Sequence, residues 1–297
     1  MRPLFSCVIP AYNGAAFLPE AVESALHQDF PESEREIIVV DDASTDGTPG
    51  VLRRYAGKIR VLRHAVNRGQ GEALRTAVRA AHGRIIAELD QDDVWRPRKL
   101  ACVERAFQAF KGVVAVCHTV SDVDRDRRPV RSPSGAPPIQ EDRLIDPRDE
   151  SVLFYSPRKE IARIDVGAGG SSWSVLRSSV LPRLAVTRPP RLWADLFYVF
   201  AAMASGGKAV RLKAPLSLWR WHEKSASFSA AGDMKKSLGL LSLYGDSLAR
   251  ARGLIADSRC PRLARDLDAL LEDVTARSLL WEHRASARAR PGRRPRC

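Results

Sequence analysis

The stretch "GEALRTAVRAAHGRIIAELDQDD", residues 71–93, contains a complete helix-to-strand unit and decides the fold class. Its first part predicts a helix that ends at Gly83, a residue typical of helix C-termini. Residues 84–90 then form a short apolar run, which predicts a buried strand. Three aspartates gather within residues 90–93, where that strand ends. Carboxylates this close repel one another, so their position at a strand end needs an explanation.

The same alternation of strand and helix extends through the first part of the chain. Short apolar runs predict strands at residues 5–10, 36–42, 58–64, 84–90 and 113–119. Helices are predicted between them, with Pro19 and Pro97 near helix starts. Strands that alternate with helices at this spacing indicate a mostly parallel central sheet with helices on both faces. The predicted fold class is therefore α/β.

Two strand endings in this sheet are acidic. "VVDD" occupies residues 39–42, and "ELDQDD" occupies residues 88–93. In open α/β sheets, ligands bind beyond the carboxyl ends of the strands, so we expect these acids to gather at one edge of the sheet. Carboxylate oxygens suit a divalent cation that holds a phosphorylated ligand. This is a first explanation for the three aspartates.

The pattern changes after the fifth predicted strand. Residues 121–151 are rich in proline and charge and predict a long surface excursion. We expect a strand and a helix start within 167–181, a helix, a Gly-Gly stop and a strand within 192–212, and another strand with a loop within 214–227. From residue 232 the sequence is leucine-rich at helical spacing, which predicts a helical appendage packed on the main body.

The chain of 297 residues has a formal net charge of +13, and the charge is uneven. Residues 284–297 contain six arginines and no acid. We expect a solvated, disordered tail, and the alternative is a tether to anionic lipid, worth about 1 kcal/mol per basic residue near the surface. Positive charge also suits nucleic acid, but no recognised nucleic-acid-binding motif accompanies it, so no nucleic-acid partner is expected.

The cysteines and the hydropathy bear on the compartment. Five cysteines lack the spacing of a metal or redox site, and their odd number is typical of reduced structural thiols. The longest uncharged apolar stretch has about 12 residues, short of the roughly 20 that a membrane-spanning helix needs. We expect a cytoplasmic protein, and the alternative interpretation of the basic tail would add peripheral attachment to the inner face of the membrane.

Four segments of the chain, taken in order, carry a resemblance to a known family. They are residues 7–28, 36–48, 67–93 and 219–227, and they resemble the family 2 glycosyltransferases. The resemblance covers residues 4–228. It implies the GT-A fold, a Rossmann-like α/β/α sandwich in which one continuous sheet binds a nucleotide.

The resemblance also implies a division of the chain. Residues 1–228 would be the glycosyltransferase domain, with a nucleotide-sugar-binding half at 1–118 and an acceptor and catalytic half at 119–228. The part that the resemblance does not cover would comprise the helical appendage at 229–283 and the basic tail at 284–297.

Roles in donor binding follow from the same resemblance. It implies that Pro10, Ala11 and Tyr12 wall the nucleobase, with Tyr12 near the ring. Asp42 would accept a hydrogen bond from the base or the ribose. Asp90 would lie toward the ribose.

The remaining motif residues would act near the diphosphate. The resemblance implies that Asp92 binds Mn²⁺ or Mg²⁺ and that Asp93 orients the loop. Arg220 and His222 match an Arg-x-His element beside the diphosphate. Asp195 lies where the family places its catalytic base.

The implied reaction explains these residue types. A sugar moves from a nucleotide-diphosphate donor, most simply a UDP-sugar, to a hydroxyl of a polysaccharide, lipid-linked or small-molecule acceptor. A hard divalent cation neutralises the departing diphosphate. A carboxylate on the opposite side of the sugar takes the proton of the attacking hydroxyl, a role that contributes about 10²- to 10⁴-fold. One in-line displacement of this kind inverts the anomeric centre.

Several alternatives remain open at this point. The acids of 90–93 could be a solvated capping turn, and Asp195 could be only a helix cap. The family usually has Glu-Asp where this chain has Ala194 and Asp195, which favours a catalytically degenerate binding or scaffold protein. A nucleotidyltransferase would carry a glycine- and arginine-rich phosphate loop after the first strand, which is missing here. A processive polymer synthase would have glutamine at Ser217 together with membrane spans.

Overall fold

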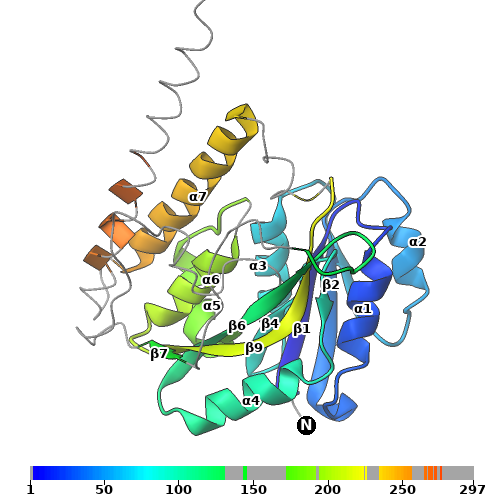
Figure 1. Cartoon of the computed structure of the whole chain (residues 1–297), viewed down its shortest axis with the longest axis horizontal. Helices are drawn as coiled ribbons and strands as arrows, with labels where there is room; N and C mark the ends of the chain where they lie inside the picture. Colours follow the sequence, from blue (N-terminus) through cyan, green and yellow to red (C-terminus); the bar gives the residue numbers. More distant parts are fainter. Residues whose placement is uncertain are drawn as a thin grey trace, which may run out of the picture.

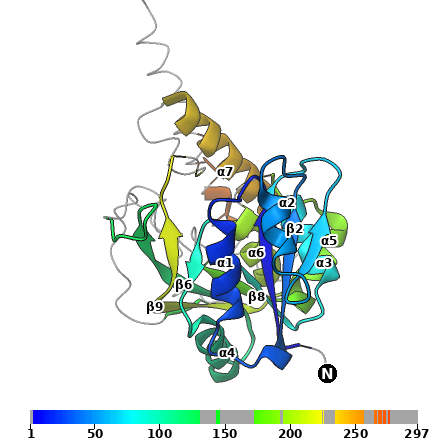
Figure 2. The same cartoon turned by 90° about the vertical axis from the view of Figure 1, so that its right-hand side faces the viewer.

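The computed structural model describes residues 3–130, 143–145, 172–191, 194–223, 225, 234–255, 264–265, 267–269, 271–272 and 275. In this part of the chain a continuous sheet lies between two layers of helices (Figures 1 and 2). The strands are β1 (Phe5–Ala11), β2 (Arg35–Asp41), β3 (Arg60–Arg63), β4 (Ile85–Glu88), β5 (Val94–Trp95), β6 (Val113–Val123), β7 (Arg143–Ile145), β8 (Trp173–Leu176) and β9 (Lys208–Arg220). The α-helices are α1 (Leu18–Leu26), α2 (Thr48–Arg53), α3 (Gln70–Ala80), α4 (Lys99–Ala109), α5 (Arg177–Val186), α6 (Ala194–Met203) and α7 (Met234–Ile255).

The strand order is β3-β2-β1-β4-β8-β6-β9-β5, and β7 pairs with β9. The four strands β3, β2, β1 and β4 are parallel neighbours. β8 is antiparallel to both β4 and β6, whereas β9 is parallel to β6 and antiparallel to β5 and β7. The α/β Rossmann-like fold is confirmed, with its parallel part in the half of the sheet that carries the acidic strand ends.

Alternating side chains of the strands build a core on each face of the sheet. On β1, Val8 packs into the cluster that contains buried residues of α3, α5, α6 and α7. Its neighbours Cys7 and Ile9 pack into the other cluster, with buried residues of α1, α2 and α4. Because successive strand residues point to opposite faces, β1 is apolar throughout and buried on both sides. This explains the uninterrupted apolar runs of the sequence.

β9 is one long strand, although two strands were predicted within 192–212 and 214–227. Pro215 lies inside it, where the pairing with β6 shifts in register. Proline lacks an N–H group and is tolerated in a strand at such a bulge. The predicted break is therefore wrong, because the proline marks a bulge and does not end the strand.

The predicted surface excursion at 121–151 also contains regular structure. β6 continues to Val123, and Arg143–Ile145 forms β7 along the edge of β9. The short strand was missed because three residues give no periodicity. Residues 131–142 and 146–171 lie outside the described residues.

The C-terminal helix α7 packs on the main body. Its residues Leu248, Ala251 and Ile255 are buried in the same cluster as Phe197 of α6. The helix predicted beyond residue 232 is thus present and shares the core of the sheet. The basic tail at 284–297 lies outside the described residues. Among the helices that are described, none combines the length and the hydropathy that a membrane span requires.

Candidate functional site

The site is built on the ends of β1, β2 and β4, which the register brings to one edge of the sheet. Ala11 at the end of β1 pairs with Asp41 at the end of β2, and the N–H of Asp42 donates to the Ala11 carbonyl at 2.8 Å. Val8 pairs with Glu88, the last residue of β4. The acidic strand ends of the sequence therefore lie side by side, as predicted.

The loop after β4 is fastened by the two aspartates on which the metal prediction depends. Asp90 Oδ1 accepts a hydrogen bond of 2.8 Å from Nε2 of Gln70, at the start of α3. Asp92 Oδ2 lies 3.0 Å from Nε2 of His222, just after β9. His222 is buried, whereas the Asp92 side chain keeps 23% of its surface exposed. The loop is therefore held from both halves of the sheet, and Asp92 stays open to solvent.

Arg220, at the end of β9, holds the same loop through hydrogen bonds to Asp92 and Asp93. Its N–H donates to Asp93 Oδ1 at 2.9 Å, and its Nε donates to the Asp92 carbonyl at 2.8 Å. Nη1 donates to the Arg125 carbonyl at 2.6 Å, and Nη2 donates to Glu20 at 2.9 Å. With 2% of its surface exposed, Arg220 binds protein groups through every part of its guanidinium. A direct contact with a diphosphate would therefore fall to the second N–H group of Nη1 or Nη2.

Phe17, just before α1, packs against both His222 and Arg220. The ring centre of Phe17 lies 4.6 Å from that of His222 and 4.8 Å from the guanidinium carbon of Arg220. Such a cation–π contact stabilises a desolvated arginine. Both residues of the predicted Arg-x-His element are therefore held against α1.

Asp42 is enclosed by the loop between β3 and α3. Its Oδ1 accepts from Nδ1 of His64 at 2.6 Å and from the N–H of Arg68 at 2.9 Å, and its Oδ2 accepts from the N–H of Gly69 at 2.7 Å. His64 is held in turn by Thr76 Oγ1, 2.9 Å from Nε2. Only 2% of Asp42 is exposed. The structure thus assigns three donors of the chain itself to the carboxylate predicted to bind the base or ribose.

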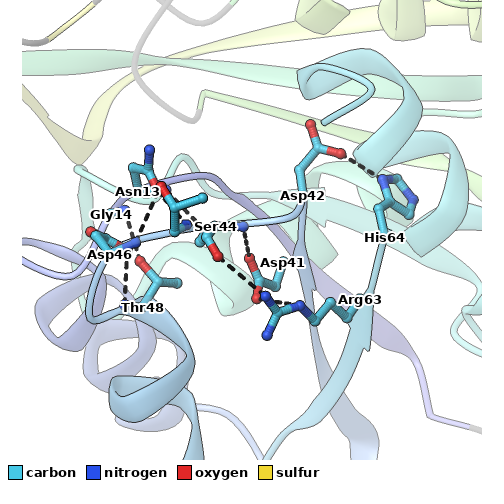
Figure 3. A network of polar contacts seen from close by, with 10 residues as sticks. Asn13, Gly14, Asp41, Asp42, Ser44, Asp46, Thr48, Arg63 and His64 are labelled. Atoms are coloured by element: carbon cyan, nitrogen blue, oxygen red, sulfur yellow. Dashed lines mark hydrogen bonds and ion pairs between the residues drawn. The ribbon is translucent and has the colours of Figure 1, made fainter. Parts of the chain in front are cut away.

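The loop after β1, which carries Tyr12, is held by side chains through its main chain (Figure 3). The N–H groups of successive residues donate to four side chains: Tyr12 to Gln91, Asn13 to Ser44, Gly14 to Thr48, and Ala15 to Asp46. Asn13 has a left-handed φ of 51°, and its side-chain oxygen accepts from the N–H of Thr45 at 2.8 Å. Tyr12 itself is 44% exposed. Pro10 and Ala11 are buried at the end of β1, so Tyr12 is the member of the predicted base wall that faces solvent.

An electrostatic link joins the acidic loop to α6. Burial, followed by the charge of Asp92, raises the pKa of Asp90 to about 7, and the charge of Asp195 contributes to the same shift. Burial, Asp90 and then Asp195 raise the pKa of Glu88 well above its usual range. Asp195, in the first turn of α6, is therefore close enough to act on both carboxyls. The predicted base and the predicted donor-binding acid share one environment.

Two glycines bring the segment before α6 against the start of α3. A Cβ on Gly71 would lie 1.9 Å from the Pro190 carbonyl oxygen, and a Cβ on Gly69 would lie 2.7 Å from that of Arg191. Tyr198 of α6 donates from its hydroxyl to the Gly71 carbonyl at 3.2 Å. This close approach sets where α6 begins, and hence where Asp195 stands relative to the loop after β4.

A buried lysine lies behind the acidic loop. Nζ of Lys99, on α4, donates to the main-chain oxygen of Glu88 at 3.3 Å and lies 3.9 Å from the ring centre of Trp95. Burial lowers the pKa of Lys99 to about 7, against the opposite effect of Glu88. A lysine with so low a pKa loses its charge in the folded protein as the pH rises above about 7.

The donor set suits a cation that a ligand helps to bind. Among the described residues, no three His, Cys, Asp or Glu side chains converge as a metal site would need on its own. Asp92 with His222 beside it supplies one partly exposed carboxylate at the sheet edge. Mg²⁺ and similar hard cations are commonly held by one or two carboxylates plus substrate phosphates. The residues therefore fit a metal that arrives with a phosphorylated ligand.

Sequence reasoning missed the residues that hold the site. Gln70, Gln91, His64, Glu20 and Phe17 contact predicted site residues, yet none was singled out. Gln91 had a signal, since it lies between two motif aspartates. The others had none, because their partners come from distant segments.

Comparison with known proteins identifies relatives over most of the chain. The sequence profile described as Glycosyl transferase family 2 matches residues 6–180. An uncharacterized glycosyltransferase of Nostoc sp. is 30% identical over 240 residues, which cover 76% of this chain and 67% of the relative. The putative teichuronic acid biosynthesis glycosyltransferase TuaG of Bacillus subtilis is 39% identical over 102 residues, 33% of this chain and 40% of TuaG. The chain thus matches about two thirds of the Nostoc relative and less than half of TuaG.

Two solved structures share the fold. The mannosyltransferase PcManGT of Pyrobaculum calidifontis, in complex with GDP-Man and Mn²⁺, has a TM-score of 0.60 at 20% identity and covers 99% of this chain and 77% of its own. TarS residues 1–349 of S. aureus, in complex with UDP-GlcNAc, has a TM-score of 0.58 at 19% identity and covers 86% of this chain and 71% of its own. At these identities the likeness concerns the fold.

Proposed function

Because the chain belongs to glycosyl transferase family 2, and is therefore a glycosyltransferase, we propose that it is a metal-dependent, inverting enzyme that uses a UDP-sugar and adds one sugar per acceptor. One observation carries this proposal. The loop with Asp90 and Asp92 meets His222 from β9 and the charge of Asp195 from α6 at a single edge of the sheet. Donor-binding acids and a candidate base thus converge from separate elements.

Donor binding is assigned to the edge formed by β1, β2 and β4. Tyr12 supplies an exposed aromatic side chain on a loop whose main chain is fixed, which suits stacking on a nucleobase. Pro10 and Ala11 shape the wall behind it, and Asp90 faces the ribose. Asp42 contributes to base or ribose recognition in this scheme, while it also holds residues 68–69 in place.

The metal proposed for this site is Mn²⁺ or Mg²⁺, held by Asp92 together with the phosphates of the donor. Asp92 is a partly exposed carboxylate of the loop, and His222 lies next to it at 3.0 Å. When bound, the cation would neutralise negative charge on the departing diphosphate. Arg220 and His222 hold Asp92 and its loop in position. A direct contact between Arg220 and the nucleotide-sugar is still a prediction.

Asp195 is proposed as the general base that takes the proton of the acceptor hydroxyl. It stands in the first turn of α6 and is partly exposed. A carboxylate can act as a general base, and the effect of its charge on Asp90 supports a location near the proposed donor site. Attack from the side opposite the diphosphate inverts the anomeric carbon.

The proposed acceptor is a hydroxyl of a polysaccharide, lipid-linked or small-molecule acceptor. The name of TuaG, for teichuronic acid biosynthesis, supports a polysaccharide. A cytoplasmic location with peripheral membrane contact through residues 284–297 would bring the enzyme to lipid-linked acceptors. Removal of these residues should weaken binding to vesicles of anionic lipid, and equal binding would dismiss the tether.

The function is tested by isothermal titration of the full chain with UDP-, GDP- and dTDP-sugars, with and without Mn²⁺. We expect the UDP-sugars to bind more tightly when Mn²⁺ is present. Tightest binding of a GDP-sugar would change the base assignment, and metal-independent binding would remove the metal. No binding under any condition would favour the alternative function, a degenerate scaffold protein, which Ala194 in place of the family's usual glutamate supports.

A further inference from the structure

The glutamine between the two motif aspartates makes a paired contact with the loop after β1. Gln91 Oε1 accepts from the N–H of Tyr12 at 2.8 Å, and Gln91 Nε2 donates to the carbonyl of Tyr12 at 3.1 Å. The side-chain amide thus copies the pair of hydrogen bonds that a neighbouring strand would make. A carboxylate or an apolar side chain could not satisfy both main-chain groups.

Gly14 leaves the space that this amide occupies. A Cβ on Gly14 would lie 2.1 Å from Gln91 Oε1 and 2.6 Å from its amide carbon. The φ angle of Gly14 is not positive, so its backbone conformation does not require glycine. Glycine is needed here because it leaves room for the Gln91 amide. Gly14 and Gln91 therefore form a matched pair across two loops.

The contact joins two loops that are otherwise held from different directions. From Asn13 onward, the loop after β1 is fixed to residues 44–48 by hydrogen bonds to Ser44 and Thr48. The loop after β4 is fixed to α3 through Asp90 and to the end of β9 through Asp92. Three consecutive residues of that loop thus hold three different elements, and Gln91 is the member that reaches Tyr12.

We propose that Gln91 is a positioning residue that couples the nucleobase wall at Tyr12 to the carboxylate of Asp92. The inference rests on the proposed function. A ligand that carries both a base and a diphosphate needs both parts of the site in a fixed relation, so it gains from the coupling. A ligand that carries the diphosphate alone does not, because Asp92 keeps its contact with His222.

The test compares two ligands on the full-length chain by isothermal titration in the presence of Mn²⁺. The first ligand is UDP, with GDP in parallel, and the second is inorganic pyrophosphate. Gln91→Met keeps the length of the side chain and removes both hydrogen bonds. Gly14→Ala displaces the same amide from the other loop, so it tests the coupling even if one variant fails to fold. Gln108→Met on the surface of α4 is the matched control for the first variant. Gly50→Ala is the control for the second, because its Cβ would make only an ordinary contact of 3.6 Å with Arg53 Nη2.

We expect Gln91→Met and Gly14→Ala to weaken nucleoside diphosphate binding about tenfold, the effect of one to two neutral hydrogen bonds. Pyrophosphate binding should change less than about twofold, a split that general damage to the fold would not give. Unchanged affinity for UDP and GDP in both variants would overturn the role of Gln91 and leave the proposed function standing. A loss of pyrophosphate affinity equal to the loss of nucleoside diphosphate affinity would do the same. Failure of the unaltered chain to bind UDP or GDP would overturn the proposed function and this role with it.

Discussion

Nη2 of Arg220 lies 2.9 Å from the carboxylate of Glu20, a residue 200 positions earlier in the chain. The contact joins the end of β9 to the first turn of α1, and the Phe17 ring packs against the same guanidinium. Because Arg220 also donates to the Asp92 carbonyl, the position of the acidic loop depends on this long-range clamp. The geometry of the site is therefore set by contacts between residues far apart in the chain.

Arg220→Lys should loosen the clamp while it keeps the positive charge. Lysine cannot make the separate contacts with Asp92, Arg125 and Glu20, and buried carbonyls would lose their donors. We expect the free energy of unfolding in urea to fall by about 2–4 kcal/mol, in the range for a broken buried network. Glu20→Gln, which keeps a hydrogen-bond acceptor at the 39%-exposed end of the pair, should cost less than about 1 kcal/mol.

Arg54→Lys is the control for this pair, because Arg54 is exposed after α2. If Arg220→Lys were no more destabilising than Arg54→Lys, the clamp would contribute nothing measurable to stability.

Asp92→Asn should remove the effect of Mn²⁺ on nucleotide binding. Asparagine has nearly the same shape and can keep a contact with His222, but it lacks the charge that a hard cation requires. We expect the affinity for UDP with Mn²⁺ to fall to the affinity measured without metal, a drop of at least about tenfold. Asp126→Asn, in an exposed turn, is the matched control. An unchanged dependence on Mn²⁺ in Asp92→Asn would place the metal elsewhere.

Asp195→Asn should separate binding from transfer. The donor site keeps its residues, so nucleotide affinity should stay within about twofold, whereas loss of a general base should lower turnover by about 10²- to 10⁴-fold. Turnover is measured as nucleoside diphosphate released from the donor that binds. Full turnover in Asp195→Asn would move the base to another residue and leave Asp195 as a helix-terminal acid.

The sequence predicted the part of the fold that obeys short-range patterns. Buried strands such as Phe5–Ala11 read as apolar runs, and the acids at their ends marked the edge where the site forms. Strand β9 is continuous although two strands were predicted there, because Pro215 is accommodated at a bulge beside β6, which no local pattern reveals. The interpretation failed where pairing with a distant strand decides the outcome.

The same limit applies to the candidate site. Asp90 and Asp92 could be named because acids gathered at a strand end form a local motif, whereas Asp195 was named because it lies where the family places its catalytic base. Gln91 and Tyr12 are 79 positions apart, and Glu20 and Arg220 are 200 apart, so no local spacing links the members of either pair. Such partners become visible only when the sheet places their loops next to one another.

Gly71→Ala tests the close approach that positions α6. The added Cβ would lie 1.9 Å from the Pro190 carbonyl oxygen, so the backbone must move. Overpacking of this kind costs about 1–3 kcal/mol of unfolding free energy, and a shift of α6 should also lower turnover. Gly253→Ala in α7 meets open space and should stabilise the protein by about 0.5–1 kcal/mol. Equal unfolding midpoints for Gly71→Ala and Gly253→Ala would show that the backbone at Pro190 moves away from the added Cβ without loss of stability.

Lys99 should make a contribution to the free energy of unfolding that rises with pH above neutrality. Burial lowers its pKa to about 7 in the folded protein, whereas in the unfolded chain the pKa keeps its ordinary value of 10.5. Between these values the unfolded state holds more protons than the folded state, so the Lys99 contribution to stability rises with pH. A full one-proton difference corresponds to about 1.4 kcal/mol per pH unit.

The measurement is the free energy of unfolding in urea at pH 7, 8 and 9 for the unaltered chain and for Lys99→Met. Methionine fills a similar volume beside Trp95 but cannot titrate, so other groups that titrate in this range cancel in the comparison. We expect the unaltered chain to gain stability relative to Lys99→Met as pH rises, with most of the gain above pH 7. The charge of Lys99 lowers the pKa of Glu88, so the two groups could instead both stay ionised. The difference in unfolding free energy between the unaltered chain and Lys99→Met would then not change with pH. That outcome would mean that the lysine remains protonated in the core.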